Sequence, residues 1–512
     1  MLFNSIQFLL FFPIVTIAYF LIPHRYRWAL ILSASCYFYM AFIPKYLLIL
    51  TVTITIDFFA GIGLEKYKGR KRKWLLVASI VSNIGMLSFF KYFNFANENL
   101  AALSSFIGWN YPIKNLAIIL PIGLSFHTFQ SLSYTIEVYR GRYKAERHFG
   151  YLATYVMFYP QLVAGPIERP QNVLPQFHTE HNFNYQRVTD GLKWIAWGMF
   201  KKVVIADRMA IFVNPIYNAP GQFSGPALLV ATLAFAIQIY CDFSGYSDIA
   251  LGSAQVMGIK LMKNFNHPYF AKSISEFWRW WHISLSTWFR DYLYIPLGGN
   301  RRSRIRWAFN LFLTFMVSGL WHGANWTFIV WGTLHGFYVV FFGLTENLWK
   351  RISGIIRLSK FPRLERGIAI VSTFSLVSFA WIFFRANSLS DAITIVQGLF
   401  SGWGEFTLQA KLAVYEGLHA FNLNGFSALV DATFATIRPI TAEPRSTIIM
   451  TLIALSVFFI IEVKQFRGDL LQAVNKQPKY LRFFSYAALV TFILIFGTAY
   501  TGTQQAFIYF QF

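Results

Sequence analysis

The stretch Ser318-Gly319-Leu320-Trp321-His322-Gly323-Ala324-Asn325-Trp326 and the earlier stretch Trp278-Arg279-Trp280-Trp281-His282-Ile283-Ser284 decide how this chain is interpreted. Each places a histidine directly after a tryptophan. An ionisable side chain at membrane depth costs roughly 2.5–3.5 kcal/mol when charged, so it usually marks function. His322 and His282 are therefore the first candidates for a site, provided that the chain around them lies in lipid.

The composition places the chain in a membrane. Hydrophobic residues make up 56% of its 512 residues and charged residues only 13%, whereas about a quarter of a soluble chain is charged. Apolar segments recur along most of the length, which predicts one all-α polytopic domain over 1–512. The first apolar stretch, Leu2–Ile22, follows no basic residue and precedes no cleavage site, so we expect a membrane segment rather than a signal peptide.

The net charge of +23 has two explanations. Lysine and arginine gather in cytoplasmic loops of membrane proteins, and a basic face also attracts anionic ligands from the cytosol. The first explanation is favoured as the main cause, and both can hold. The basic runs flank apolar segments, which disfavours a nucleic-acid partner. Cys36 and Cys241 lie in apolar stretches, so we expect buried free thiols and neither a disulfide framework nor a zinc site.

Basic clusters predict the orientation of the chain. The strongest, Lys66–Lys73, indicates a cytoplasmic loop, and counting segments from it places both ends of the chain outside. The expected segments are 28–43, 46–64, 75–93, 119–139, a hairpin near 307–346, and 367–385, 447–463 and 483–503. The division that follows has N-terminal helices over 1–139, a catalytic core over 150–346, an outer loop over 386–446 and an extracytoplasmic tail over 504–512.

The stretch 150–300 alternates apolar runs with polar and proline-rich breaks. Irregular backbone at membrane depth is tolerated only where protein or a wet cavity surrounds it. We therefore expect short, tilted or re-entrant helices here.

His322 lies near the far turn of the expected hairpin. Gly319, Gly323 and Asn325 interrupt the helix around it, as a cavity-lining break would. An apolar site favours the neutral imidazole, which can accept a proton as a general base, an effect worth about 10²–10⁴ in rate. The alternative is a structural histidine packed between Trp321 and Trp326.

His282 is one of four residues spaced four positions apart, with Trp278, Ser286 and Arg290. This spacing predicts that the four side chains lie on one face of a helix. The alternative is an interfacial helix of an aromatic belt.

Four further features favour structure over chemistry. Asp242 and Asp248 follow an apolar run, and carboxylates at a helix end there would cap the helix or orient a histidine. Glu168 and Arg169 suggest a local ion pair. His127 falls inside an expected segment. From its residues alone, the chain is expected to be a membrane protein with a polar cavity that contains histidines. This description fits both a transporter and an enzyme.

The tryptophan-rich run Trp278–Asn300 and the element Trp321-His322-Gly323 resemble the membrane-bound O-acyltransferase family (MBOAT), most closely its bacterial alginate O-acetylation branch. Other stretches resemble that branch too: Leu162-Val163-Ala164-Gly165-Pro166-Ile167, Tyr240-Cys241-Asp242-Phe243-Ser244-Gly245-Tyr246-Ser247-Asp248 and Trp381-Ile382-Phe383-Phe384-Arg385-Ala386. The resemblance implies the MBOAT fold, with roughly 10–12 membrane segments and short re-entrant or interfacial helices around a central tunnel. It implies that His322 is catalytic and that His282 is the second family position.

The C-terminal run Phe507-Ile508-Tyr509-Phe510-Gln511-Phe512 resembles the terminal motif of the same branch, which implies Tyr509 as a transient acyl acceptor. The alternative is an aromatic anchor. The resemblance further implies O-acetylation of an alginate-type or other glycan in the bacterial inner membrane, with acetyl-CoA or an acyl carrier as donor and a periplasmic SGNH-type acetyltransferase as partner. No metal and no tightly bound cofactor are expected. A transporter and a D-alanyl transferase for teichoic acid are the alternatives.

Overall fold

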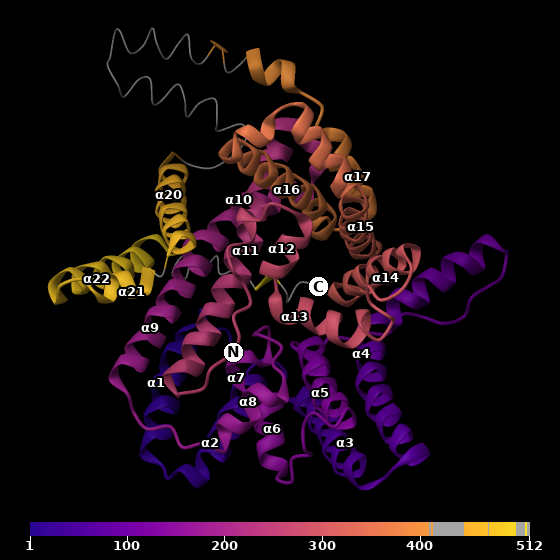
Figure 1. Ribbon diagram of the computed structural model, residues 1–512, viewed down its shortest axis with the longest axis vertical. Coiled ribbons are helices and arrows are strands. Elements are labelled where there is room, and N and C mark those ends of the chain that lie inside the picture. Colours follow the sequence, from indigo (N-terminus) through magenta and orange to yellow (C-terminus); the bar gives the residue numbers. More distant parts are fainter. Residues whose placement is uncertain (409–410, 413–444, 469, 498–506, 509–512) are drawn as a thin grey trace.

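A computed structural model describes residues 1–408, 411–412, 445–468, 470–497 and 507–508 of the chain. All regular elements in these ranges are helices. Figure 1 shows them arranged around α12 and α13, with the N-terminal helices on one side and α15 to α17 on the opposite side. The all-α prediction is therefore confirmed.

The N-terminal part consists of five helices that match the expected segments closely. They are α1 (Ile6–Leu21), α2 (His24–Met40), α3 (Leu47–Lys66), α4 (Gly69–Phe106) and α5 (Leu124–Tyr139). The prediction was wrong mainly in length, because α4 continues well beyond residue 93. Asparagines and a glutamate follow there, and these polar residues form a helix as readily as the apolar ones before them.

The stretch 150–300 contains short helices, as expected, but also two long ones. The short ones are α6 (Phe149–Met157), α7 (Tyr159–Leu162), α8 (Pro170–Phe177), α12 (Ile274–Trp280), α13 (Ile283–Phe289) and the π-helix η5 (Arg290–Tyr294). Between them α9 (Tyr185–Met199), the π-helix η2 (Phe200–Ala206) and α10 (Asp207–Asn218) run on without a break, and α11 (Gly225–Val256) packs along them.

Glycines bring α9 and α11 into contact. A Cβ atom added to Gly198 would lie 2.5 Å from the carbonyl oxygen of Gly245, and one added to Gly191 would lie 2.8 Å from that of Gly252. Small residues at such positions let two membrane helices approach at the level of their backbones. This close pair supports the charged side chains described below.

The remaining helices complete the molecule. They are α14 (Arg304–His322), α15 (Trp326–Ile355), α16 (Pro362–Arg385), α17 (Leu389–Gly398), α20 (Arg445–Arg467), α21 (Leu470–Asn475) and α22 (Lys479–Phe496). Four 3₁₀ turns lie between helices: η1 (Pro44–Tyr46), η3 (Pro220–Gln222), η4 (Pro268–Phe270) and η6 (Leu358–Lys360). The expected hairpin near 307–346 is confirmed by α14 and α15.

In the described part, seven helices are long and apolar enough to cross a membrane, and α1 is a shorter apolar helix. The chain is thus a multi-pass membrane protein. The number of 10–12 segments stays a prediction, since several further helices are shorter or more polar.

Candidate active site

The α14–α15 hairpin fixes His322 at its turn. Ser303 caps the start of α14, and the helix ends at His322, where Gly323 takes an extended conformation. Asn325 then caps α15 by accepting a hydrogen bond from the backbone of Thr327 at 2.9 Å. Gly323 and Asn325, two of the three breaks that the sequence indicated around His322, therefore end one helix and start the next. The third expectation was wrong, because Gly319 lies inside α14, where it allows the close crossing described next.

The two helices of the hairpin cross closely just before this turn. A Cβ atom added to Gly319 would lie 2.3 Å from the carbonyl oxygen of Phe328, and one added to Gly332 would lie 2.9 Å from the Cα atom of Gly319. This crossing leaves the backbone before His322 little room to move.

His322 is buried among aromatic rings. Its side chain is 4% exposed, and its ring centre lies 4.9 Å from Trp321, 4.9 Å from Trp331 on α15 and 5.4 Å from Phe384 on α16. Rings from three helices, α14, α15 and α16, thus surround the imidazole. Such an enclosure excludes bulk water, which strengthens any electrostatic or proton-transfer interaction inside it.

His282 lies between two helices and not on one. α12 ends at Trp280 and α13 begins at Ile283, and His282 between them has a φ of 43° in the left-handed region. The prediction that Trp278, His282, Ser286 and Arg290 share one helical face was wrong. Spacing of four describes a face only where the helix is continuous.

Asn264 holds the break in place. Its carbonyl accepts the N–H of Ile283 at 2.9 Å, and its side-chain oxygen accepts the N–H and the hydroxyl of Ser284 at 3.1 and 2.9 Å. A non-glycine residue in the left-handed region persists only where its surroundings enforce it, and such residues cluster at functional sites.

The fold brings the two histidines together. Their ring centres lie 6.5 Å apart, and His282 is fully buried. Phe243 of α11 contacts His282 with ring centres 4.6 Å apart, and Phe126 of α5 does so at 6.1 Å. The site is therefore a buried histidine pair inside a box of aromatic side chains.

Two consecutive residues of α4 bind the end of α14, and the sequence did not single them out. The Lys91 ammonium donates to the carbonyl oxygens of Trp321 and His322, each at 2.8 Å, and the Tyr92 hydroxyl donates to that of Leu320 at 2.8 Å. The last carbonyls of a helix have no partner within it. A lysine in an apolar helix was the signal that could have revealed this contact.

A third histidine, His335 on α15, was also missed. It is fully buried, and its Nδ1 atom accepts a hydrogen bond from the indole of Trp278 at 3.2 Å. Trp331 lies between it and His322, with ring centres 5.1 and 4.9 Å away. We assign His335 to holding the tryptophans that enclose the pair.

Two cavities lie beside α14, at different levels along it. One of about 380 Å³ lies beside the middle of the helix, where Thr314 and Ser318 line it together with Arg279 and Arg290. The other, of about 400 Å³, is lined by Lys91, Gly323, Asn325 and Arg385, beyond the end of the helix. His322 lies on the helix between these two levels.

The carboxylates Asp242 and Asp248 occupy the middle of α11 and not a helix end, so the capping prediction was wrong. Asp242 pairs with Lys202 at 2.6 Å and Asp248 with Lys201 at 2.6 Å. Lys202 also pairs with Asp207 at 2.9 Å. Both lysines belong to the π-helix η2 and are buried. Pairing of this kind offsets the free-energy cost of burying charged groups within a membrane protein.

The other residues that the sequence singled out have structural roles. Arg169 pairs with Asp291 at 3.4 Å and not with Glu168, which corrects the expected local ion pair. Glu168 is fully buried and accepts hydrogen bonds from the backbone of Met262 and from Asn172. His127 is buried and hydrogen-bonded to Thr53 at 2.6 Å, and Cys36 and Cys241 are free thiols, half-buried and buried respectively.

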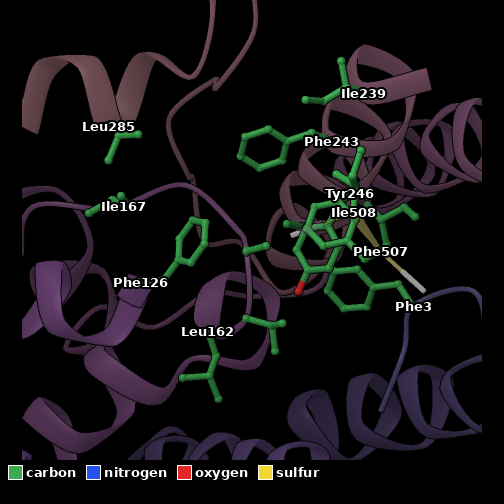
Figure 2. Close-up of a cluster of buried hydrophobic side chains, with 14 of the residues drawn as sticks. Phe3, Phe126, Leu162, Ile167, Ile239, Phe243, Tyr246, Leu285, Phe507 and Ile508 are labelled. Atoms are coloured by element: carbon green, nitrogen blue, oxygen red, sulfur yellow. The ribbon is translucent and has the colours of Figure 1, made fainter. Parts of the chain in front are cut away.

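Tyr509 lies outside the described residues. The two residues before it are placed in the core: Phe507 and Ile508 are 3% and 2% exposed. The Phe507 ring lies 4.8 Å from that of Tyr246 and 5.9 Å from that of Phe243. Figure 2 shows Phe507 and Ile508 beside Tyr246 and Phe3.

Comparison with known proteins agrees with this architecture. The model of the MBOAT, membrane-bound O-acyltransferase family matches residues 146–386, which contain both histidines. "Probable alginate O-acetylase AlgI" of Azotobacter vinelandii is 40% identical over 412 residues, which cover 80% of this chain and 79% of that protein. "Peptidoglycan O-acetyltransferase" of Helicobacter pylori is 34% identical, with 78% and 80% covered. "Teichoic acid D-alanyltransferase" of Bacillus subtilis is 28% identical, with 54% and 71% covered. The chain is an acyltransferase and belongs to the membrane-bound O-acyltransferase family.

Proposed function

We propose that this acyltransferase takes an acetyl group from acetyl-CoA in the cytosol and passes it through the bacterial inner membrane for O-acetylation of an exopolysaccharide or cell-wall glycan, most simply one of the alginate type. The observation that carries this proposal is the buried histidine pair on α14 and between α12 and α13, with one cavity beside the middle of α14 and another beyond its end. The relatives named for O-acetylation of alginate and peptidoglycan support the acetyl group and the glycan class.

The cavity beside the middle of α14 suits the donor. Along the helix it lies between His322 and the basic turn Arg301–Arg306, which the positive-inside rule assigns to the cytoplasm. Arg279 and Arg290 line it, and guanidinium groups bind the phosphates of a CoA molecule well. An acyl carrier protein presents a phosphopantetheine arm of similar chemistry, so the donor assay below includes both.

In the proposed reaction an acceptor hydroxyl gives its proton to the neutral imidazole of His322. Its oxygen then forms a bond with the acetyl carbonyl carbon, the carbon–sulfur bond breaks, and the proton returns from His322 to the departing thiolate. The products are an acetyl ester and free CoA thiol. His282, whose ring centre lies 6.5 Å away, helps to position the donor or the acceptor.

The acceptor in this proposal is the hydroxyl of Tyr509. Phe507 and Ile508 lie in the core next to Phe243, which itself contacts His282. Phe507 is thus separated from His282 by one aromatic ring. The acetyl-tyrosine would then pass its acetyl group to a serine of a periplasmic SGNH-type acetyltransferase, which modifies the glycan.

Purified variants given labelled acetyl-CoA, or the acetylated carrier protein, test the role of His322. We expect His322→Ala to lose transfer by at least about 10²-fold, the usual worth of a general base, while it still accumulates in the membrane. His127→Gln is the matched control, because it changes another buried membrane histidine outside the site. Comparable transfer by His322→Ala and wild type would refute the proposal.

Tyr509→Phe tests the acceptor, because it removes one oxygen and keeps the aromatic ring. We expect glycan acetylation in cells to be abolished and CoA release by the purified protein to stop. Mass spectrometry of the wild-type C-terminal peptide should show an acetyl-tyrosine. Normal glycan acetylation by Tyr509→Phe would leave the tail as an aromatic anchor.

A further inference from the structure

A backbone hydrogen bond ties Ile508, in the C-terminal tail, to the core. The N–H of Ile508 donates to a carboxylate oxygen of Asp242 at 2.6 Å. Both residues are buried, with 2% and 3% of their surfaces exposed. Asp242 lies in the middle of α11, and most of the chain separates it from Ile508.

The other oxygen of the same carboxylate contacts a cation. The Lys202 ammonium lies 2.6 Å from it and 2.9 Å from Asp207. The single ammonium group of Lys202 thus serves two carboxylates, of Asp207 and Asp242, while Lys201 pairs separately with Asp248. A buried carboxylate needs donors on both oxygens, and in this acid-rich cluster the tail provides one of them.

The same contact sets where the tail lies. Phe507 packs on Tyr246, one helical turn after Asp242, and on Phe243. Phe243 in turn contacts His282, with ring centres 4.6 Å apart. Figure 2 shows Phe507, Tyr246 and Phe243 in one cluster. Fixing the backbone at Ile508 therefore fixes the point from which the rest of the tail can reach, at ~3.3 Å per residue.

We propose that Asp242 is a positioning residue for acyl transfer: its carboxylate, oriented by Lys202, captures the backbone of the C-terminal tail and holds it beside the histidine pair. The positioning role in acyl transfer rests on the proposed function. The binding of the tail backbone by Asp242 does not depend on that function. Because Asp242 binds a backbone N–H, the capture is independent of the side chain at position 508.

Ile508→Pro isolates the hydrogen bond, since proline has no N–H and every residue of the charged cluster stays intact. Ile508→Val is the matched control, because it keeps the N–H and most of the apolar contact. Full-length protein in detergent is treated with chymotrypsin, and mass spectrometry measures cleavage after Tyr509 and Phe510, two bonds that do not involve residue 508. Loss of a hydrogen bond to a charged group should expose the tail about tenfold more often.

We expect Ile508→Pro to be cleaved about tenfold faster than wild type and Ile508→Val to resemble wild type. Equal digestion rates for the proline variant and wild type would overturn the capture. Equal, faster digestion of both variants would also overturn it, because packing rather than the N–H would then hold the tail.

Asp242→Asn tests the acceptor side. It keeps an oxygen that can accept the N–H but loses the pairing with Lys202, and we expect a digestion rate between those of wild type and Ile508→Pro. A digestion rate equal to that of wild type would show that the charge of Asp242 has no part in the capture.

Glycan acetylation in cells separates this inference from the proposed function. A released tail with lost acetylation supports both. A released tail with normal acetylation keeps the capture and refutes the tail as acyl acceptor. A docked tail with lost acetylation in Ile508→Pro overturns the positioning role of the hydrogen bond and leaves the acceptor role of Tyr509 intact.

Discussion

At the scale of single residues, two substitutions of His282 can distinguish the role of its backbone conformation from the role of its imidazole. Its φ of 43° is costly for most side chains, by roughly 1–2 kcal/mol, and less so for asparagine. We expect His282→Asn to keep the melting temperature near that of wild type and to lose transfer activity. His282→Ala should lose activity and also melt several degrees lower. Melting curves and transfer assays on the two variants check this. Equal melting of both would show that the break stores no strain.

Lys91 gives a second prediction at this scale. Lys91→Met keeps the apolar length of the side chain but removes the donors to the carbonyls of Trp321 and His322. An unsatisfied buried carbonyl costs about 1–3 kcal/mol, so the end of α14 should shift. We expect kcat to fall about tenfold or more while the KM for the donor stays within a factor of about two.

Tyr92→Phe is the control for Lys91→Met. It removes the donor to Leu320, one residue further from the histidine, so its effect on kcat should be smaller. An unchanged kcat in Lys91→Met would mean that His322 needs no support from α4.

Glu168 predicts a pH dependence of stability. It lies in the loop between α7 and α8, outside the membrane-spanning helices, and burial raises the pKa of its carboxyl group to about 7, despite hydrogen bonds from Met262 and Asn172 that lower it. The folded protein therefore holds this proton more tightly than the unfolded chain. The protonated carboxyl group therefore adds to the free energy of unfolding. This contribution, of up to about 3 kcal/mol, is complete below the pKa that the group has in the unfolded chain, and it is lost as the pH rises through about 7.

Glu168→Gln should remove this part of the pH dependence. Gln has no proton to lose, so between pH 5 and pH 8 its melting temperature in detergent should fall less than that of wild type. If both proteins show the same slope, the carboxyl group is ionised throughout this range.

Residue patterns predicted part of the site, for physical reasons. Glycine and asparagine around His322 indicated a helix break, and a break there is what the structure has. The partners of Lys91 are backbone carbonyls and the partner of Asp242 is a backbone N–H. Such groups occur at almost every position, so their involvement leaves no mark in the sequence.

At the scale of helices, the contact between α9 and α11 gives a prediction about packing. Gly198→Ala would place a methyl group 2.5 Å from the carbonyl oxygen of Gly245. The helices would have to separate, at a cost of about 1–3 kcal/mol, and the lysines of η2 would move with them. We expect a lower melting temperature and a faster cleavage of the C-terminal tail by chymotrypsin.

Gly85→Ala on α4 is the matched control, because a Cβ atom there meets no other atom within 4 Å. Alanine favours a helix over glycine by about 1 kcal/mol, so this variant should melt at or slightly above the temperature of wild type. Equal loss of stability in both variants would show that the close contact does not explain the effect in Gly198→Ala.

Helix positions were predicted well where a segment is long and uniformly apolar, as in α3 and α16. The prediction failed in α11, where Asp242 and Asp248 suggested an end to the helix. Ion pairs with Lys201 and Lys202 neutralise these carboxylates, and the partners come from a different helix. The sequence of one segment shows its charged residues, but it does not show the partners from another helix that make their burial possible.

At the scale of the whole molecule, the orientation in the membrane can be tested on α4 alone. This helix runs from Gly69 to Phe106 over 38 residues, about 57 Å at 1.5 Å per residue. A hydrocarbon core is about 30 Å thick, so the two ends of α4 lie on opposite sides if the helix spans. The basic run Lys66–Lys73 places the first end in the cytoplasm. Lys71→Cys and Asn110→Cys put an exposed thiol at each end.

An impermeant maleimide should label Asn110→Cys in intact spheroplasts and Lys71→Cys only after the membrane is opened. Wild type is the background control, because Cys241 is buried and Cys36 half-buried. This result would place the cavity with Lys91 and Arg385 on the outer side, since both residues lie toward the outer ends of their helices. It would place the cavity with Arg279 and Arg290 on the cytosolic side, where a CoA donor is available. Labelling of Lys71→Cys in intact spheroplasts would reverse the whole molecule, and the proposed direction of acetyl transfer would then be wrong even if His322 is the base.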